Sequence, residues 1–412
     1  MVKERLWNRR FAKLLCIETM LQFGLYLTRP IISSYAVSLG ASLAVAGFLA
    51  GLLATAALAI RPVSGVVSDR LSKKGLLVVS CALFAVSAMG CAAFRSLPLL
   101  GAFLALQGFS FAFKSTIVVS LASLVVPQAK VGAGVGWLGL AYTFACAAAP
   151  AVGSVVGAAW GYPATFAVSG ALLSVGLVLA VSFKAPAAAQ VPAGLTASRP
   201  ARMHGGWLYR PVLFLSCVAG LLMVAQGVTS SFVVLVGELR GIPGASLYFF
   251  AYSLATLAAR PLAGKASDRW GVRVVAPPAM LVAAAGMVVM AFSDGFAGVV
   301  VAGACMGVGQ GSAYCALQAE SVRGVPEDLL GRAANTFYLG PDLCMGLGPV
   351  VGGFILQRAG VSAMFLFNAL AVVLGLALFF VYAARRRHDG GPARGRRAEG
   401  PSGAQAQEGK AR

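Results

Sequence analysis

The chain has 412 residues, of which 59% are hydrophobic and only 11% charged. Soluble domains carry roughly 25% charged residues, so this composition excludes an ordinary soluble globular protein, and its long apolar runs exclude a largely disordered one. The formal net charge is +20, from 33 Lys and Arg against 13 Asp and Glu. In a soluble protein such a charge would indicate nucleic acid, but its distribution along this chain has another explanation.

Twelve apolar runs are each long enough to cross a bilayer as a helix. A helical span needs about 20 residues. A helix forms all its backbone hydrogen bonds within itself, which is necessary because the lipid hydrocarbon offers no hydrogen-bond partners. In chain order the predicted spans are 12–36, 41–64, 75–94, 98–124, 133–159, 163–183, 211–237, 244–264, 274–293, 297–319, 333–356 and 361–383. The first run is too long for the apolar segment of a cleaved signal, so we expect it to remain a span.

Two polar segments divide the chain. Residues 184–210 are rich in Ala, Pro and Arg and are predicted to form a flexible cytoplasmic linker. Residues 385–412 are rich in Gly and Arg and are predicted to form a disordered basic tail. The sequence thus predicts an N-terminal six-helix bundle over 1–183 and a C-terminal one over 211–384.

Lys and Arg are distributed unevenly between the two sides of the membrane. With the N-terminus placed in the cytoplasm, the outer loops contain only Arg95, Arg240 and Arg358, and nearly all the other basic residues fall in inner segments. This bias predicts that both termini are cytoplasmic. It also explains the net charge without a nucleic-acid partner.

Metal and disulfide chemistry is not expected. All eight Cys fall inside predicted spans with no CxxC pair, which is typical of small apolar packing residues. The two His, His204 and His388, lie in the predicted linker and tail. The spans therefore offer no His-based metal or catalytic site, and no cofactor is expected.

The two halves share motifs at one constant sequence offset. Arg61-Pro62-x-x-Gly65-x-x-Ser68-Asp69-Arg70 reappears as Arg260-Pro261-x-x-Gly264-x-x-Ser267-Asp268-Arg269, Val126-Pro127 matches Val325-Pro326, and Pro150-x-x-Gly153 matches Pro349-x-x-Gly352. Matches in separated places at one offset predict two related bundles about an axis along the membrane normal. Secondary transporters use this architecture.

The repeated Gly-x-x-x-Asp-Arg element resembles the signature loop of the major facilitator superfamily, and the resemblance covers the chain from about Arg9 to Tyr382. It implies an all-α membrane protein with twelve transmembrane helices in two pseudo-symmetric six-helix bundles. The run 331–337, together with Asp342 and the Gly348-Pro349-x-x-Gly352-Gly353 run, resembles bacterial efflux-type members, which are drug or metabolite:proton antiporters. This implies a bacterial cytoplasmic-membrane protein that functions as a monomer.

The resemblance also implies a role for the signature residues as a conformational latch on the cytoplasmic side in the outward-facing state. The latch residues are Gly65, Asp69, Arg70, Gly264, Asp268 and Arg269. Physically, the glycines allow close helix approach, and the carboxylates can cap a helix or pair with a neighbouring Arg. A static loop ion pair is the alternative.

The chain departs from the family pattern at two places. Ser72 occupies a position where the family usually has Gly, whereas the second copy keeps Gly271. In the fourth span, Gln107-Gly108 is present, but Leu104 replaces the usual Arg. The proton-coupling role of that Arg therefore cannot be transferred to this chain.

Four charged residues inside the spans have no charged counterpart in the other half: Glu18, Arg29, Lys114 and Asp342. A charge at a helix centre costs about 2.5–3.5 kcal/mol on insertion scales, so such residues normally face the bundle interior or a water-filled cavity. Alternatives are that Arg29 extends to the outer surface or that Lys114 forms a static ion pair.

Helical spacing places further polar residues on the faces of these charges. The stripes are Glu18, Gln22, Tyr26, Arg29 and Ser33; Gln107, Ser110 and Lys114; Gln310, Tyr314 and Gln318; and Asn335, Tyr338 and Asp342. The resemblance implies that spans 1, 4, 7 and 10 line the central cavity, which adds Gln226 and Ser230. Polar helix–helix contact is the alternative role of such stripes.

The leading hypothesis is a secondary transporter that exports an organic small molecule in exchange for protons. Burial shifts acids and bases toward titration near neutral pH, so the proton carrier is Glu18, Asp342 or Lys114. An uptake symporter for a sugar or organic acid remains open, as does a non-transporting membrane sensor. An enzyme is not expected, because the chain has no nucleophile–base pair and no HExxH motif.

Overall fold

The helices of the N-terminal half follow the predicted spans closely. The computed structural model describes residues 7–127, 131–185, 208–323, 325–326 and 329–388. The elements are α1 (Arg9–Thr28), η1 (Arg29–Ile31), α2 (Ile32–Ser38), α3 (Leu43–Arg70), α4 (Lys73–Ala93), α5 (Leu97–Val125), α6 (Val131–Trp160) and α7 (Tyr162–Val181). The first predicted span is interrupted, because Pro30 at the start of η1 replaces one α-helical turn with a 3₁₀ turn.

The C-terminal half consists of α8 (Arg210–Leu239), α9 (Leu247–Trp270), α10 (Val272–Phe292), α11 (Phe296–Val322) and α12 (Leu330–His388). Helix α12 contains the last two predicted spans, which are separated by a non-helical turn at Gly360. It continues beyond the predicted start of the tail at 385. The remainder of the predicted linker and tail, 186–207 and 389–412, lies outside the described residues.

Nine helical segments of the described chain are long and apolar enough to span a membrane, and one of them, Thr336–Arg385, contains both of the last two spans. Helices α1 and α9 fall outside this set. Both contain charged residues, including Glu18 in α1 and Arg260 in α9, that reduce their mean hydropathy. Charged side chains thus reduce the apolar character of these two spans, whereas α5 and α12 remain in the set although they contain Lys114 and Asp342.

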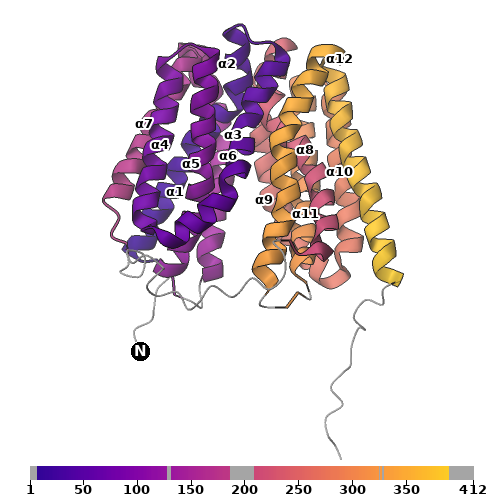
Figure 1. Cartoon of the computed structure of the whole chain (residues 1–412). Helices are drawn as coiled ribbons and strands as arrows, with labels where there is room; N and C mark the ends of the chain where they lie inside the picture. The colour runs from indigo at the N-terminus through magenta and orange to yellow at the C-terminus, as the bar shows by residue number, and fades with distance from the viewer. Residues whose placement is uncertain (1–6, 128–130, 186–207, 324, 327–328, 389–412) are drawn as a thin grey trace, which may run out of the picture.

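The helices form two bundles side by side, with α1–α7 in one and α8–α12 in the other (Figure 1). Within the bundles, α1 packs against α6 and α7, and α8 packs against α12. The two most extensive contacts between the bundles are α3 with α12 and α6 with α9, and η1, α2 and α3 also contact α8. The sequence offset relates α3 to α9 and α6 to the first part of α12, so these two contacts are equivalent under the internal repeat.

The turns preserve the repeat in one place and break it in another. Gly161 and Gly360, which occupy equivalent positions, both have φ of +82°, a conformation that only glycine adopts readily. Gly271 also has φ of +82°, but its counterpart Ser72 has φ of −57° and caps α4 by accepting a hydrogen bond from the amide of Gly75 at 3.3 Å. The serine therefore replaces a glycine turn with a helix cap.

Helix α1 begins and α12 ends at the same end of the molecule (Figure 1), which we call the inner end; the opposite end is the outer end. The α3–α12 contact lies toward the outer end. A Cβ built on Gly47 or Gly51 would collide with a carbonyl oxygen of α12, and one on Gly353 would lie 2.6 Å from the carbonyl oxygen of Leu43. Glycine thus allows the two backbones to touch.

Two hydrogen bonds also join the bundles at the outer end. Tyr162 donates to Oε1 of Glu238 at 2.9 Å, and the amide of Ala44 donates to Oε1 of Gln357 at 3.0 Å. Among the described residues, no side-chain hydrogen bond joins the bundles near the inner end. The structure is therefore closed toward the outer end.

Candidate functional site

A buried ion pair connects α1 to α5. The Nζ of Lys114 lies 2.7 Å from Oε1 of Glu18, and the two side chains are only 3% and 7% exposed. Gln22, one helical turn further along α1, donates its Nε2 to the same carboxylate oxygen at 2.7 Å. The second oxygen of Glu18 is buried with no hydrogen-bond partner. Lys114 thus forms an ion pair, which was the alternative to a free cavity-lining position, and the second oxygen of Glu18 remains available as an acceptor.

A second cluster, where α1 ends and η1 begins, surrounds Arg29. Its side chain is 8% exposed, so the alternative in which it reaches the outer surface is wrong. One guanidinium nitrogen lies 3.4 Å from the hydroxyl of Tyr26, and that hydroxyl lies 3.1 Å from the hydroxyl of Tyr142 on α6. The tyrosine rings are nearly perpendicular, with centroids 5.5 Å apart. The predicted polar face of α1 thus divides between two separate clusters.

The C-terminal bundle contributes amides and hydroxyls. Gln310 on α11 accepts a short hydrogen bond from the hydroxyl of Tyr252 on α9, and its Nε2 contacts the sulfur of Met223 on α8 at 3.3 Å. Gln226, one turn along α8, is buried, and its carbonyl oxygen has no partner among the described residues. The burial of Gln226 is consistent with its predicted position in the interior of the protein.

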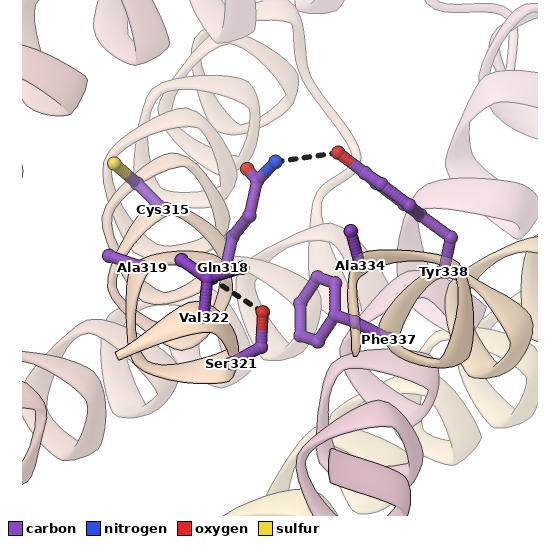
Figure 2. Close-up of a pocket in the computed structure, with 8 residues that line it drawn as sticks. All are labelled: Cys315, Gln318, Ala319, Ser321, Val322, Ala334, Phe337 and Tyr338. Atoms are coloured by element: carbon purple, nitrogen blue, oxygen red, sulfur yellow. Dashed lines mark hydrogen bonds between the residues drawn. The ribbon is translucent and has the colours of Figure 1, made fainter. Parts of the chain in front are cut away.

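A cavity of about 280 Å³ lies between α11 and the first part of α12, toward the inner end. Figure 2 shows the amide of Gln318 pointing toward the hydroxyl of Tyr338, to which it donates at 2.6 Å. The ring of Phe337 lies 5.6 Å from that of Tyr314, and Asp342 interacts electrostatically with Tyr314. The predicted polar stripes of these two helices therefore face each other. The side chain of Asn335 lies outside the described residues.

A polar face between α6 and α9 was not predicted as part of the site. A cavity of about 10 Å³ lies in this contact between the two bundles, and its lining residues are Tyr142, Thr143, Cys146, Tyr252, Ser253, Thr256 and Arg260. The hydroxyl of Ser253 is buried without a hydrogen-bond partner. The signal was present in the sequence, because Tyr252, Thr256 and Arg260 recur every four residues along an otherwise apolar span.

The signature residues lie at the inner end, and only the second copy is described in full. Gly65, Asp69 and Arg70 lie in the last part of α3, but their side chains are outside the described set. In the second copy, Asp268 pairs with Arg323 at the end of α11 at 3.5 Å, with side chains 80% and 45% exposed.

The expected pairing of Asp268 with an arginine is present, but the partner is Arg323 rather than Arg269, and the expected close helix approach at Gly264 is wrong in this conformation. The guanidinium of Arg269 lies over the ring of Trp270, 5.5 Å from its centroid, and forms no ion pair with Asp268 among the described residues. No atom lies within 4 Å of a Cβ built on Gly264, so the expected close helix approach is absent.

The chain is similar in sequence to bacterial transporters. The family model described as Major Facilitator Superfamily matches residues 14–334 and 215–408. The uncharacterized MFS-type transporter YhhS of Escherichia coli is 26% identical over 356 residues, covering 83% of this chain and 84% of that protein. An uncharacterized MFS-type transporter of Salmonella typhimurium is 27% identical over 235 residues, which span 52% of this chain and only 60% of that relative.

Solved transporter structures share the fold at low sequence identity. A POT family transporter in complex with a thioalcohol-conjugated peptide aligns with a TM-score of 0.78 at 11% identity, over 92% of this chain and 96% of that one. A point mutant of the nucleoside transporter NupG aligns with a TM-score of 0.75 at 13% identity, over 91% and 99% of the two chains. The fold and the family match agree: this chain belongs to the major facilitator superfamily and is an integral membrane transporter.

Proposed function

We propose that this protein exports an organic small molecule from the bacterial cytoplasm in exchange for protons. The observation that carries the proposal is the buried ion pair of Glu18 and Lys114, which leaves one carboxylate oxygen without a partner. That oxygen can accept a proton without breaking any existing hydrogen bond. Protonation removes the negative charge and leaves Lys114 unneutralised, so the local charge differs between the two states.

Such a charge change can drive a conformational cycle. The buried ion pair stabilises the conformation that holds Glu18 and Lys114 together only while both side chains are charged, so protonation of Glu18 favours another conformation. A unit charge that crosses a potential of 100 mV contributes about 2.3 kcal/mol. One proton per cycle therefore supplies enough free energy to maintain a substantial substrate gradient. Asp342, which lies near Tyr314 on the opposite bundle, is the second candidate carrier.

The proposed cycle begins from the conformation described above. The inner end corresponds to the cytoplasmic side, since the basic segments lie there, and substrate enters between the bundles from that side. The bundles then rock about the contact between α6 and α9, separating α3 from α12 at the outer end. In the outward-facing state, the two signature loops come together and act as the latch at the inner end.

The test is proton-driven flux in inside-out vesicles. A growth-inhibition and metabolite screen of cells that overproduce the wild type or Asp342→Asn first identifies a substrate. Glu18→Gln and Asp342→Asn are then compared with Asp294→Asn, which removes an exposed carboxylate from the loop between α10 and α11. We expect the control to retain flux and at least one of the two test variants to lose its dependence on the pH gradient.

Full proton-driven flux in both test variants would refute the coupling assignment. Uptake of the same compound together with protons would instead identify a symporter, which counterflow measurements distinguish by direction. Ligand binding with no flux in any condition would favour a sensor.

A further inference from the structure

Two arginines, one from each bundle, lack a carboxylate partner among the described residues. Arg29 is buried, and its hydrogen bond and cation–π contact within the described part of the chain are both with Tyr26. Arg260 lines the small cavity between α6 and α9. Lys114 differs from both, because Glu18 neutralises it. Neither guanidinium group has a carboxylate within ion-pair distance among the described residues, although the charges of Arg260 and Asp342 both act on Tyr314.

The positive charges of Arg29 and Arg260 both act on the same part of α6. The charges of both arginines reach Tyr142 and Cys146 on α6. Arg29 reaches Tyr142 through the contact between the hydroxyls of Tyr26 and Tyr142, whereas Arg260 lines the cavity beside it. Both guanidinium groups thus contribute positive potential at the α6–α9 cavity.

The hydroxyl of Ser253 is available to donate into the cavity, whereas those of Tyr252 and Thr256 already donate to Gln310 and Gly307. The hydroxyl of Ser253 lines the cavity, belongs to a residue that is only 2% exposed, and has no partner at hydrogen-bond geometry among the described residues, its one polar interaction being with the weakly bonding thiol of Cys146. A buried hydroxyl without a partner is costly unless a ligand or water binds it. The cavity of about 10 Å³ holds a single water-sized group, which is also the size of one carboxylate oxygen.

We infer that this junction binds the carboxylate of an organic anion. One oxygen occupies the cavity, where Ser253 donates to it and Arg260 pairs with it. Because Arg260 is exposed, the rest of the ligand extends from it toward the inner end. The rings of Tyr142 and Tyr252, which line the same cavity, favour an aromatic or apolar body next to the carboxylate.

This inference rests on the proposed transport function, since it names the chemical class of the exported compound. The inference gives each basic residue of the site one role, which the sequence alone did not. Lys114 belongs to the proton site with Glu18, and Arg260 rather than Lys114 holds the anion. Arg29 is a positioning residue, which orients the hydroxyl of Tyr142 and adds positive charge through Tyr26.

The test is equilibrium binding of radiolabelled benzoate to the purified full-length protein in lipid nanodiscs, with no pH gradient. Benzamide and benzylamine serve as neutral and cationic competitors of the same shape. We expect benzoate to bind the wild type and neither analogue to displace it. Arg260→Gln and Ser253→Ala should weaken benzoate binding, the former by about tenfold or more.

Lys265→Gln is the matched control, because it removes one positive charge from an exposed position on the same helix; it should bind benzoate as the wild type does. Arg29→Gln should weaken binding while Arg29→Lys retains it, since the charge is what matters. The thermal unfolding midpoint of each variant shows that it remains folded.

Three results would overturn the inference: no benzoate retained on the wild type at millimolar concentration, displacement by benzylamine as effective as by benzoate, or equal affinities of Arg260→Gln and Lys265→Gln. The proposed function fails in a different way. Benzoate would then bind as expected, but pH-driven flux would be unaffected by both Glu18→Gln and Asp342→Asn.

Discussion

At the scale of single residues, Glu18 and Lys114 depend on each other because both are removed from water. Their 2.7 Å contact offsets a desolvation cost that neither side chain could meet alone. Their separation of 96 positions along the chain brings together two helices of one bundle. The stability of the pair and its proposed response to protons therefore have the same physical origin.

Removing one partner of this pair should destabilise the protein. We expect Lys114→Met to lower the free energy of unfolding by about 3–5 kcal/mol, because it leaves a buried carboxylate uncompensated. The double variant Glu18→Gln/Lys114→Met should recover most of that loss. Thermal unfolding in detergent measures both, with Lys265→Met as the exposed control. Equal melting temperatures of the single and double variants would contradict the coupling of the two charges.

The turn glycine Gly271 provides a second residue-scale prediction. Its φ of +82° and ψ of 163° lie in a region that is essentially restricted to glycine, so Gly271→Ala should cost about 1–3 kcal/mol. Gly264→Ala, in a helix with open space around the Cβ position, should instead be neutral or stabilising by up to about 1 kcal/mol. Chemical denaturation of the two variants compares them directly, and a stable Gly271→Ala protein would exclude the strain argument.

The sequence identified charged residues that lack a charged counterpart in the other half, but not a charged residue that is repeated in both halves. Glu18 and Lys114 could be identified because no charged residue matches them in the other half, but nothing in the sequence shows that they pair across 96 positions. Arg260 was overlooked because Arg61 matches it in the first half, so it was treated as part of the repeated framework.

At the scale of helices, the contact between α3 and α12 depends on the absence of side chains. Gly47 and Gly51 bring α3 directly against the carbonyl oxygens of α12. Any side chain there must push the helices apart at the outer end. Closure of the outer end therefore depends on the small volume of Gly47 and Gly51, although neither residue has a functional group.

Enlarging this contact should open the outer end. We expect Gly51→Leu to increase the labelling of a cysteine introduced at Glu238 by a membrane-impermeant maleimide, in a background without other cysteines. The expected increase is several-fold, because overpacking of about 1–3 kcal/mol disfavours the closed state. Gly136→Leu on α6, where nothing lies within 4 Å of the Cβ, is the control. Unchanged labelling in Gly51→Leu would show that the contact does not control this end.

Helix positions were well predicted because the length of apolar runs largely determines them. The twelve spans all correspond to helices, and the family and the fold class are confirmed. The sequence did not predict the 3₁₀ turn at Arg29–Ile31, although Pro30 is a signal for it. That turn matters, since it places Arg29 among the buried residues.

At the scale of the whole molecule, the two bundles are held together differently at their two ends. The outer end has backbone contacts and the hydrogen bonds from Tyr162 and Ala44. The sequence cannot predict such a difference, because one sequence supports conformations that differ by only a few kcal/mol. The conformational state is therefore a finding of the structure alone.

The bond from Tyr162 to Glu238 should help to set the balance between these conformations. Tyr162→Phe removes a hydrogen bond to a charged group, which contributes about 1.5–3 kcal/mol. We expect a larger fraction of outward-open molecules, measured as longer distances between spin labels on α7 and α8 near the outer end. Asp294→Asn, at an exposed carboxylate outside this contact, should leave the distances unchanged. A distribution for Tyr162→Phe identical to that of the wild type would count against the role of this bond.

The buried Arg29 has a consequence for how voltage acts on the protein. A guanidinium that moves relative to the membrane field contributes electrical work in proportion to the fraction of the potential it crosses. An anion bound beside Arg260 would carry a negative charge through the same field, so it would offset the work done on Arg29 in the loaded carrier but not in the empty one. The resting potential of the cell would then govern the return of the unloaded protein rather than the step that moves cargo.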